Sequence, residues 1–147
     1  VLAVASPVFT QAEIEQSTVD LRAHQPLHDQ THAVHAVGFC LPGQGIVMAR
    51  EDVGRHNALD KLIGALARQG IDASQGAIVL TSRISVEMVQ KSAMARVPMI
   101  IAVSAPTAHA VRLAKSVNIT LAAFVRGGGF DLYSNTQIPF RGVCHVA

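Results

Sequence analysis

An α/β fold is predicted for this chain of 147 residues by three observations. From residue 45 onward, short apolar runs alternate with segments whose apolar residues recur every three or four positions, the spacing of a helix face. Polar or glycine-containing stretches follow the apolar runs, as loops follow buried strands. Half of the residues are hydrophobic, which is enough to bury the core of one domain spanning residues 1–147. Strands that alternate with helices in this way pair in parallel through right-handed crossovers.

A helix and a hairpin are predicted before this alternation. Thr10 can cap a helix and Glu13 can reach back to it, so a helix is expected from there to about Ala23. Residues 31–40 and 45–50 are two extended runs separated by a Pro-Gly turn, which predicts an antiparallel hairpin.

Hydrophobic spacing defines the elements after the hairpin. Leu59, Leu62, Ile63 and Leu66 fall on one face of a helix, and Gly70 ends it. In order, we expect a helix at 57–69, a strand at 77–80, a helix at 86–95, a strand at 99–103, a helix at 106–117, a strand at 119–125 and an extended segment at 130–133.

Four loops are expected to share one edge of the sheet, because the carboxyl ends of parallel strands meet there. They are residues 50–57, 81–85, 104–106 and 126–129. Their arginines are Arg50, Arg55, Arg83 and Arg126. Guanidinium forks and the free N–H groups of helix starts both bind phosphate oxygens. The spacing therefore predicts a site for a phosphorylated small molecule.

The other polar residues of these loops allow more than one role. Glu51 and Asp52 are expected to pair with the neighbouring Arg50 and Arg55, with a general-base role as the alternative. The position of His56 at a helix start is compatible with an acid, a ligand contact or a cap partner. The triple glycine at 127–129 is either a flexible turn or part of the ligand site.

Composition argues against several classes of protein. The net charge is only +2, Trp is absent and there is one Tyr, so a nucleic-acid partner is not expected. The apolar runs are too short to cross a bilayer. Cys40 and Cys144 fit no metal-ligand spacing, and His32 and His35 would point to opposite faces of a strand, so no metal site is predicted. Two cysteines in a domain of this size suit the cytoplasm.

The most specific pattern in the chain is the segment at 50–61, Arg-Glu-Asp-Val-Gly-Arg-His-Asn-Ala-Leu-Asp-Lys. Further matching segments are Ser82-Arg83, residues 87–94, residues 102–105, Thr31 and His35-Ala36. In this order and spacing, from about Gln25 to Ser134, the chain resembles the FdhD family. Its members are formate dehydrogenase accessory proteins that act as sulfur carriers for molybdenum cofactor.

This resemblance implies a fold and a role. The implied fold is a three-layer α/β/α sandwich with a mixed sheet, similar to cytidine deaminases. The implied role is to receive sulfur from a cysteine desulfurase and pass it to molybdenum bis(molybdopterin guanine dinucleotide) before that cofactor enters formate dehydrogenase. GDP is a partial mimic of this cofactor. A cytoplasmic homodimer is also implied.

The resemblance implies where the cofactor is held. Family members use the segment that aligns with Phe124, Val125, Arg126, Gly127, Gly128 and Gly129. We predict that Arg55, His56 and Arg83 also contact the guanine dinucleotide. No catalytic residue is predicted.

One feature of the family is absent from this chain. Family members carry sulfur on a Cys-x-x-Cys motif upstream of the helix that starts here near Thr10, and neither Cys40 nor Cys144 matches it. The chain is therefore expected to be the carboxyl-terminal part of a longer protein, able to bind cofactor but not to carry sulfur. The alternatives are a guanine-nucleotide-binding regulatory module without sulfur transfer and a small metal-dependent hydrolase. A deaminase is not expected, because its His-x-Glu and Pro-Cys-x-x-Cys zinc motifs are missing.

Overall fold

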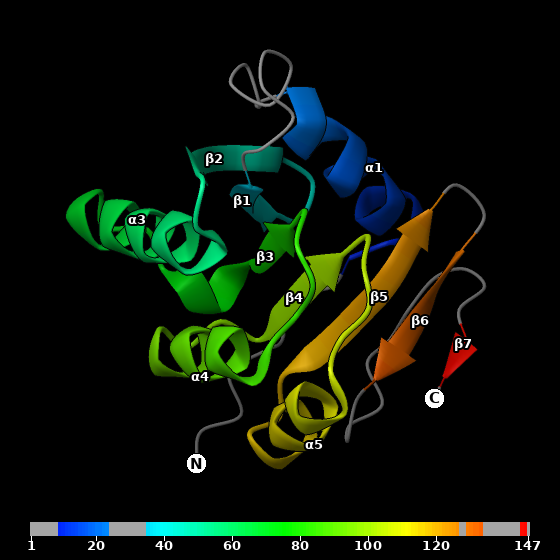
Figure 1. Cartoon of the computed structure of the whole chain (residues 1–147). Coiled ribbons are helices and arrows are strands. Elements are labelled where there is room, and N and C mark those ends of the chain that lie inside the picture. The colour runs from blue at the N-terminus through cyan, green and yellow to red at the C-terminus, as the bar shows by residue number, and fades with distance from the viewer. Residues whose placement is uncertain (1–8, 24–34, 127–128, 134–144, 147) are drawn as a thin grey trace.

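A mixed sheet crosses the molecule and helices cover both of its faces (Figure 1). The computed structural model describes residues 9–23, 35–126, 129–133 and 145–146. Within these residues the sheet has seven strands in the order β2-β1-β3-β4-β5-β6-β7. The α/β class predicted from the sequence is confirmed.

The bounds of the elements are close to those expected. The strands are β1 (His35–Leu41), β2 (Gly45–Asp52), β3 (Ala77–Leu80), β4 (Met99–Ala102), β5 (Thr120–Arg126), β6 (Gly129–Tyr133) and β7 (His145–Val146). The helices are α1 (Gln11–Ala23), α3 (Arg55–Arg68), α4 (Val86–Met94), α5 (Ala108–Ser116) and the short 3-10 helix η1 (Ala73–Gln75).

The sequence pattern did not specify the position of β1 in the sheet. The β1–β2 hairpin forms as expected, but β1 also pairs antiparallel with β3, with Val37 opposite Leu80. It therefore lies between β2 and β3, which α3 connects along the chain. The reason is burial, since the inner five residues of β1 are all buried whereas β2 is largely half-exposed. The more apolar strand takes the inner position.

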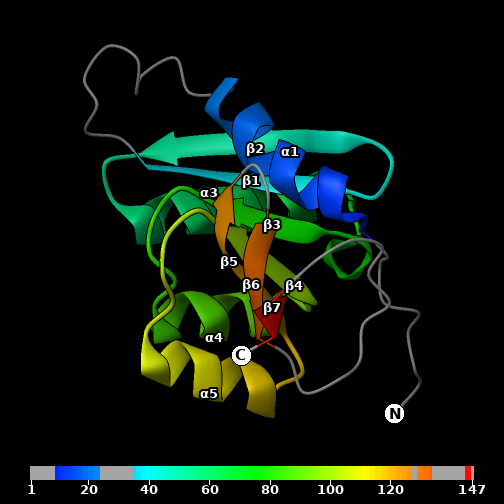
Figure 2. The same cartoon turned by 90° about the vertical axis from the view of Figure 1, so that its right-hand side faces the viewer.

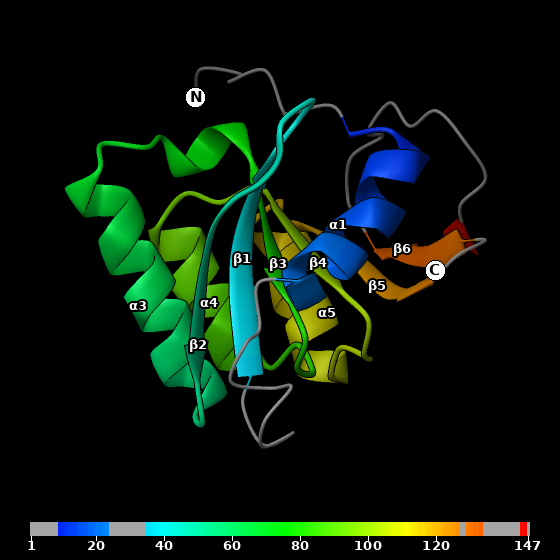
Figure 3. The ribbon, with the colours of Figure 1, turned by 90° about the horizontal axis from the view of Figure 1, so that it is seen from above.

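The two faces of the sheet carry two separate cores. Helices α3, α4 and α5 lie on one face and α1 on the other (Figures 1 and 3). Alternate residues of β3 serve each face: Ile78 and Leu80 join the core under α3 and α4, while Ala77 and Val79 join the core under α1. This is the period of two expected of a strand. All four residues are buried, so the strand needs cover on both sides.

The start of α1 is fixed as the sequence predicts. Thr10 Oγ1 accepts a hydrogen bond from Glu13 N and Glu13 Oε1 accepts one from Thr10 N, each at 3.1 Å. Glu13 Oε2 also accepts from Gly43 N, in the β1–β2 turn, at 2.5 Å. Burial acts to raise the pKa of Glu13, but these hydrogen bonds outweigh it and the pKa is lowered. One carboxylate thus links the helix to the hairpin.

Helix α5 begins later than the sequence predicts. Pro106 lies outside the helix, and Thr107 is the cap, with its hydroxyl oxygen accepting a hydrogen bond from Ala110 N at 3.0 Å. A side-chain cap one residue after the proline sets the start of the helix here.

Two glycines should respond to alanine in opposite directions. A Cβ at Gly76 would collide with the carbonyl oxygen of Cys40 and the ring of Phe39, whereas one at Gly64 meets only the flexible end of Arg68. We expect Gly76→Ala to destabilise the protein by about 1–3 kcal/mol. Gly64→Ala, within α3, should stabilise it by about 0.5–1 kcal/mol. Urea denaturation of both variants checks this, and a Gly76→Ala protein as stable as the parent would contradict the packing described.

Candidate functional site

The loops at the carboxyl edge of the sheet are tied to one another by hydrogen bonds. Because β1 is antiparallel to both neighbours, β2 runs in the same direction as β3, β4 and β5. Thr81, just after β3, donates from its N–H to Ala36 O at 3.2 Å, and its Oγ1 accepts from Ala36 N at 3.0 Å. Ile84 N donates to Ala105 O at 3.2 Å, which joins the loops after β3 and β4. The predicted convergence of loops is confirmed for their described residues.

The end of β5 is held in an unusual backbone conformation. Phe124 has a φ of 55°, in the left-handed region, and the residue is 38% exposed. Its N–H donates to Ser104 O at 3.3 Å, and its carbonyl accepts from Arg126 Nη1 at 2.8 Å. A bulky residue in this conformation costs about 1–2 kcal/mol, and such strain concentrates at functional sites. The predicted cofactor segment therefore begins at a strained residue.

The remainder of that segment is only partly described. Val125 is buried and belongs to the core under α1, while Arg126 is exposed. Gly127 and Gly128 lie outside the described residues. Gly129 opens β6 with a φ of 153°, a conformation that other residues rarely adopt.

Helix α3 begins earlier than the predicted residue 57, so Arg55 and His56 lie in its first turn. Gly54 is the N-cap residue and provides no side-chain acceptor for the first N–H groups of the helix. Its own N–H donates to Asp52 Oδ1 at 3.0 Å. The start of α3 is thus open, with an exposed arginine and a half-buried histidine beside it.

The expected ion pairs of the polar loop are wrong. Asp52 pairs with Lys61, in the second turn of α3, at 2.6 Å, and not with Arg50 or Arg55. Hydrogen bonds from Lys61 and then from the N–H of Gly54 hold the pKa of Asp52 below its ordinary value. Arg50 turns back to its own strand, where Nη1 donates to Ala49 O at 2.7 Å.

A second cluster of polar groups surrounds the start of α4. The pKa of Glu87 is lowered chiefly by its own backbone N–H, and further by the Ser85 hydroxyl and the charges of His56 and Arg55. The charged side chains at the start of α3 are therefore close enough to the start of α4 to act on the carboxylate of Glu87. Ser85 is 8% exposed, and its Oγ makes no well-directed hydrogen bond. Arg83 is exposed in the same loop.

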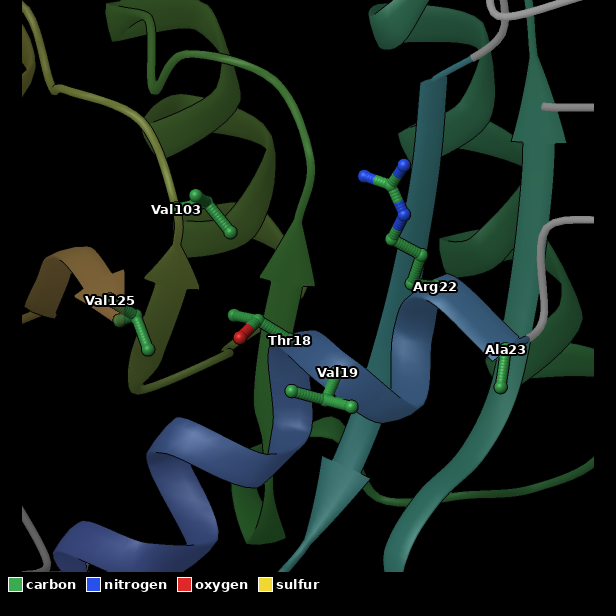
Figure 4. A pocket seen from close by; sticks show the side chains of 6 residues that line it. All are labelled: Thr18, Val19, Arg22, Ala23, Val103 and Val125. Carbon is green, nitrogen blue, oxygen red and sulfur yellow. The ribbon is translucent and has the colours of Figure 1, made fainter. Parts of the chain in front are cut away.

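A pocket on the other face of this edge was not predicted. It measures about 490 Å³ and is lined by residues of α1 and of the ends of β4 and β5 (Figure 4). Figure 2 shows α1 lying across this face of the sheet. Its lining residues are Thr18, Val19, Arg22, Ala23, Val103 and Val125. Val103 ends a run that looks like a buried strand, but it is 49% exposed. Only its position past the last paired residue of β4 could have indicated this.

Cys40 lines a different pocket, of about 300 Å³, together with Glu13 and Asp20. The thiol is buried, and burial raises its pKa to about 12, with the two carboxylates adding to the effect. Such a thiol is protonated and poorly nucleophilic at neutral pH.

Within the described ranges, no group of three or more histidine, cysteine or acidic side chains is placed to hold a metal ion. No helix in the part of the chain that the structure describes is long and apolar enough to span a membrane.

Comparison with known proteins shows to which protein family this chain is related. The sequence model of the FdhD/NarQ family matches residues 2–138. The chain belongs to the FdhD/NarQ family. Two curated relatives named sulfur carrier protein FdhD support this: one from Brucella abortus is 53% identical over 84% of this chain, and one from Bordetella parapertussis is 55% identical over 90%. The family predicted from the loop residues is confirmed.

The same comparisons describe the extent of the match. The chain spans about half of the length of these FdhD relatives, 46% and 47% respectively. A crystal structure of a candidate formate dehydrogenase accessory protein from Desulfotalea psychrophila superposes with a TM-score of 0.81 and 31% identity. It covers 89% of this chain, and this chain covers 56% of it. The fold is therefore shared with a related accessory protein.

The environment of Cys40 leads to a prediction about its reactivity. With a pKa of about 12, only about one thiol in ten thousand is ionised at pH 8. Iodoacetamide should leave Cys40 unmodified in the folded chain and label it after denaturation. Peptide-resolved mass spectrometry reads Cys40 separately from Cys144. Rapid labelling of folded Cys40 would show that the thiol is more accessible and more acidic than its surroundings indicate.

The Asp52–Lys61 pair leads to a prediction about pH. Because folding lowers the pKa of Asp52, its stabilising effect is present above the unfolded pKa, near 4, and is lost as pH falls through the folded value. Asp52→Asn should lower the melting temperature by a few degrees at most at pH 7.

The difference in melting temperature between parent and variant should disappear in acid, where the side chain at position 52 is neutral in both proteins. Lys61→Met is the matched control, since it removes the same ion pair from the other side. A melting difference that is independent of pH would mean that the charge of Asp52 does not matter.

Proposed function

We propose that this chain is the cofactor-binding part of an FdhD-type sulfur carrier. Its cargo is molybdenum bis(molybdopterin guanine dinucleotide), bound at the carboxyl edge of the sheet. The sulfur is carried by a Cys-x-x-Cys motif that this chain does not contain, so its residues bind and orient the cargo and have no part in bond making. The observation that carries the proposal is the convergence of open helix starts and exposed arginines in a family of sulfur carriers.

The residues at this edge fit a nucleotide diphosphate. Arg55 and Arg83 are exposed, and His56 lies beside Arg55 in the first turn of α3. The buried Ser85 Oγ lacks a well-directed partner, as expected of a group that bonds to a ligand. Backbone N–H groups at a helix start and arginine forks are the common ligands of phosphate oxygens in proteins.

The acidic side chains near this edge do not prevent the binding of phosphate groups. Asp52 is neutralised by Lys61 at 2.6 Å. Glu87 is satisfied by its own N–H, and its charge faces Arg55 and His56. Glu51, the other acidic residue of the loop, is half-buried, whereas Arg55 and Arg83 are exposed, so phosphates that approach the edge meet exposed guanidinium groups. The segment from Phe124 to Arg126 lies beside the loop after β4 through the Phe124–Ser104 hydrogen bond.

The partners follow from the same role. The names of the relatives and of the structural neighbour refer to sulfur carriage and to formate dehydrogenase. We place a cysteine desulfurase upstream as the sulfur donor and formate dehydrogenase downstream as the recipient of the cofactor, with a cytoplasmic homodimer as the working form.

Calorimetric titration with GDP, with ATP as the comparison ligand, tests this proposal. GDP should bind in preference to ATP. Arg55→Ala should weaken GDP binding about tenfold or more, since it removes a charge-assisted hydrogen bond to phosphate. Arg68→Ala is the matched control, because Arg68 is exposed in the last turn of the same helix.

Unchanged GDP affinity in Arg55→Ala would remove this residue from the site. Failure of the unaltered chain to bind GDP would reject the proposal that these loops suffice for nucleotide binding. If a parent protein containing this sequence restored formate dehydrogenase activity in a strain lacking its carrier, the regulatory-module alternative would be excluded.

A further inference from the structure

Helices α4 and α5 lie side by side on one face of the sheet (Figures 1 and 2). Each helix follows a parallel strand, α4 after β3 and α5 after β4, so both run back toward the amino edge of the sheet. Their carboxyl ends therefore lie at the edge opposite the one at which we place the cargo. We call the surface at these ends, formed by Met94, Arg96, Arg112, Lys115 and Val117, the helix-end surface.

Two apolar side chains of the helix-end surface are open to solvent. Met94, the last residue of α4, is 86% exposed, and Val117, the C-cap residue of α5, is 39% exposed. Methionine adapts its shape to different neighbours and is common on surfaces that bind other proteins. The helix-end surface therefore has an apolar part that the fold itself does not bury.

The charged residues of this region have one sign. No Asp or Glu occurs between Glu87 and Asp131 in the sequence, whereas five Lys or Arg residues do. Helix α5 contains Arg112 and Lys115 and no acidic residue. Arg112 is exposed and makes no hydrogen bond or ion pair with another described residue.

Acidic side chains from neighbouring elements balance only part of this charge. Asp60 of α3 pairs with Lys91 at 2.9 Å. Hydrogen bonds from the hydroxyl and the N–H of Ser74 hold the pKa of Asp72 below its ordinary value, and the charge of Arg96 adds to this effect. The charge of Arg112 has no such partner in the part of the chain that the structure describes, so it is available to another molecule.

Arg96 has a backbone conformation that glycine adopts more readily. Its φ is 65°, in the left-handed region, and it directly follows Ala95, the C-cap residue of α4. Glycine is the usual residue at this position, because other residues have a conformational cost there. Such costs persist mainly where a side chain has a function. The guanidinium group is what glycine could not supply, so a role for Arg96 lies in its side chain.

Exposed apolar side chains beside positive charge fit an acidic protein surface. Helices that bind membranes bury a continuous apolar face with Trp, Phe or Leu, and nucleic-acid sites usually set aromatic residues among the cations. The helix-end surface has neither, since its apolar residues are Met94 and Val117. Apolar contacts within a polar rim, with complementary charges, are the usual composition of a protein interface.

We propose that the helix-end surface docks a partner protein that presents acidic residues around an apolar patch. Met94 is the apolar contact, and Arg96 and Arg112 are the charged contacts. This inference goes beyond the proposed function and does not depend on nucleotide binding. A partner bound at this edge leaves the opposite edge, with the proposed cargo site, open.

The test measures the affinity of the chain for a labelled helical peptide by fluorescence anisotropy. The peptide has leucines along one face and glutamates on both sides of them, and a second peptide has lysines in place of the glutamates. The glutamate peptide should bind and the lysine peptide should not. The affinity should fall as salt is raised, because exposed charges are screened.

Matched variants assign the binding to this surface. Arg112→Glu should weaken binding of the glutamate peptide about tenfold, whereas Arg22→Glu, at an exposed arginine of α1, should change it by less than about twofold. Met94→Ser should also weaken binding about tenfold, and Val19→Ser, at an exposed valine of α1, is its control.

Arg96→Gly separates a contact from a structural role. It removes the guanidinium and the unfavourable backbone conformation together, so it should weaken peptide binding while raising the melting temperature by a few degrees. If Arg96 had a structural role alone, the melting temperature would fall and the peptide affinity would stay the same.

The remaining outcomes would overturn the proposal. They are no binding of the glutamate peptide, equal binding of both peptides, or a glutamate-peptide affinity that Arg112→Glu and Met94→Ser leave unchanged. Loss of peptide binding in Arg55→Ala would place the peptide at the cargo edge instead. Binding to phosphatidylserine vesicles but not to the peptide would assign the surface to a membrane. Failure of GDP to bind would reject the proposed function and leave this inference standing.

Discussion

The pairing of β1 between β2 and β3 determines where every loop of the candidate site lies. Because β1 is antiparallel to both neighbours, the ends of β2, β3, β4 and β5 face one edge. The same strand brings Ala36 against Thr81, so the loop after β3 is anchored to the start of β1. If β1 occupied the outer position, its buried side chains would be exposed and the loop after β3 would lose this anchor.

The edge that results has two chemically different sides. The starts of α3 and α4 present arginines and open N–H groups on one face of the sheet. On the other face, α1 and the ends of β4 and β5 line a mostly apolar pocket that is open to solvent. The loops after β3 and β4 run between these sides and are bonded to each other. The charged groups of this edge therefore lie on one face of the sheet and its apolar pocket lies on the other.

Much of the fold was predictable because its elements follow simple periods. The apolar residues of α3 and the buried runs of β3 and β4 specify type and approximate length, and the Thr10–Glu13 pair specifies a helix start. Pairing order was not predictable in the same way. The sequences of β1 and β2 do not indicate which of the two strands pairs with β3. The choice depends on which strand buries more apolar surface in the assembled sheet.

The candidate site was predictable only on its charged side. Arginines that follow apolar runs indicate where strands end. The segments that identify the family, residues 50–61 and Ser82-Arg83, lie in the same loops. The pocket was missed because Arg22 has the sequence context of an ordinary helix end and Val103 that of a buried strand. The ion-pair partner of Asp52 was also missed, because the distance between Asp52 and Lys61 depends on how α3 is oriented relative to the end of β2. Such contacts arise from assembly of the fold and leave no local pattern.

Two helices of the proposed site, α3 and α4, start without a side-chain hydrogen bond to their first turn, whereas other described helices have one. The hydroxyl of Thr107 and the carboxylate of Asp72 each accept a hydrogen bond from the first turn of the helix that they cap. Gly54 cannot cap α3 with a side chain, and Ser85 is a good capping residue whose Oγ stays without a well-directed bond. Phe124 adds strain at the same edge. Proteins retain such local violations mainly where function requires them. The two uncapped helices are also the two that carry Arg55, His56 and the loop of Arg83, so the unmet hydrogen bonds and the free positive charge occupy the same place.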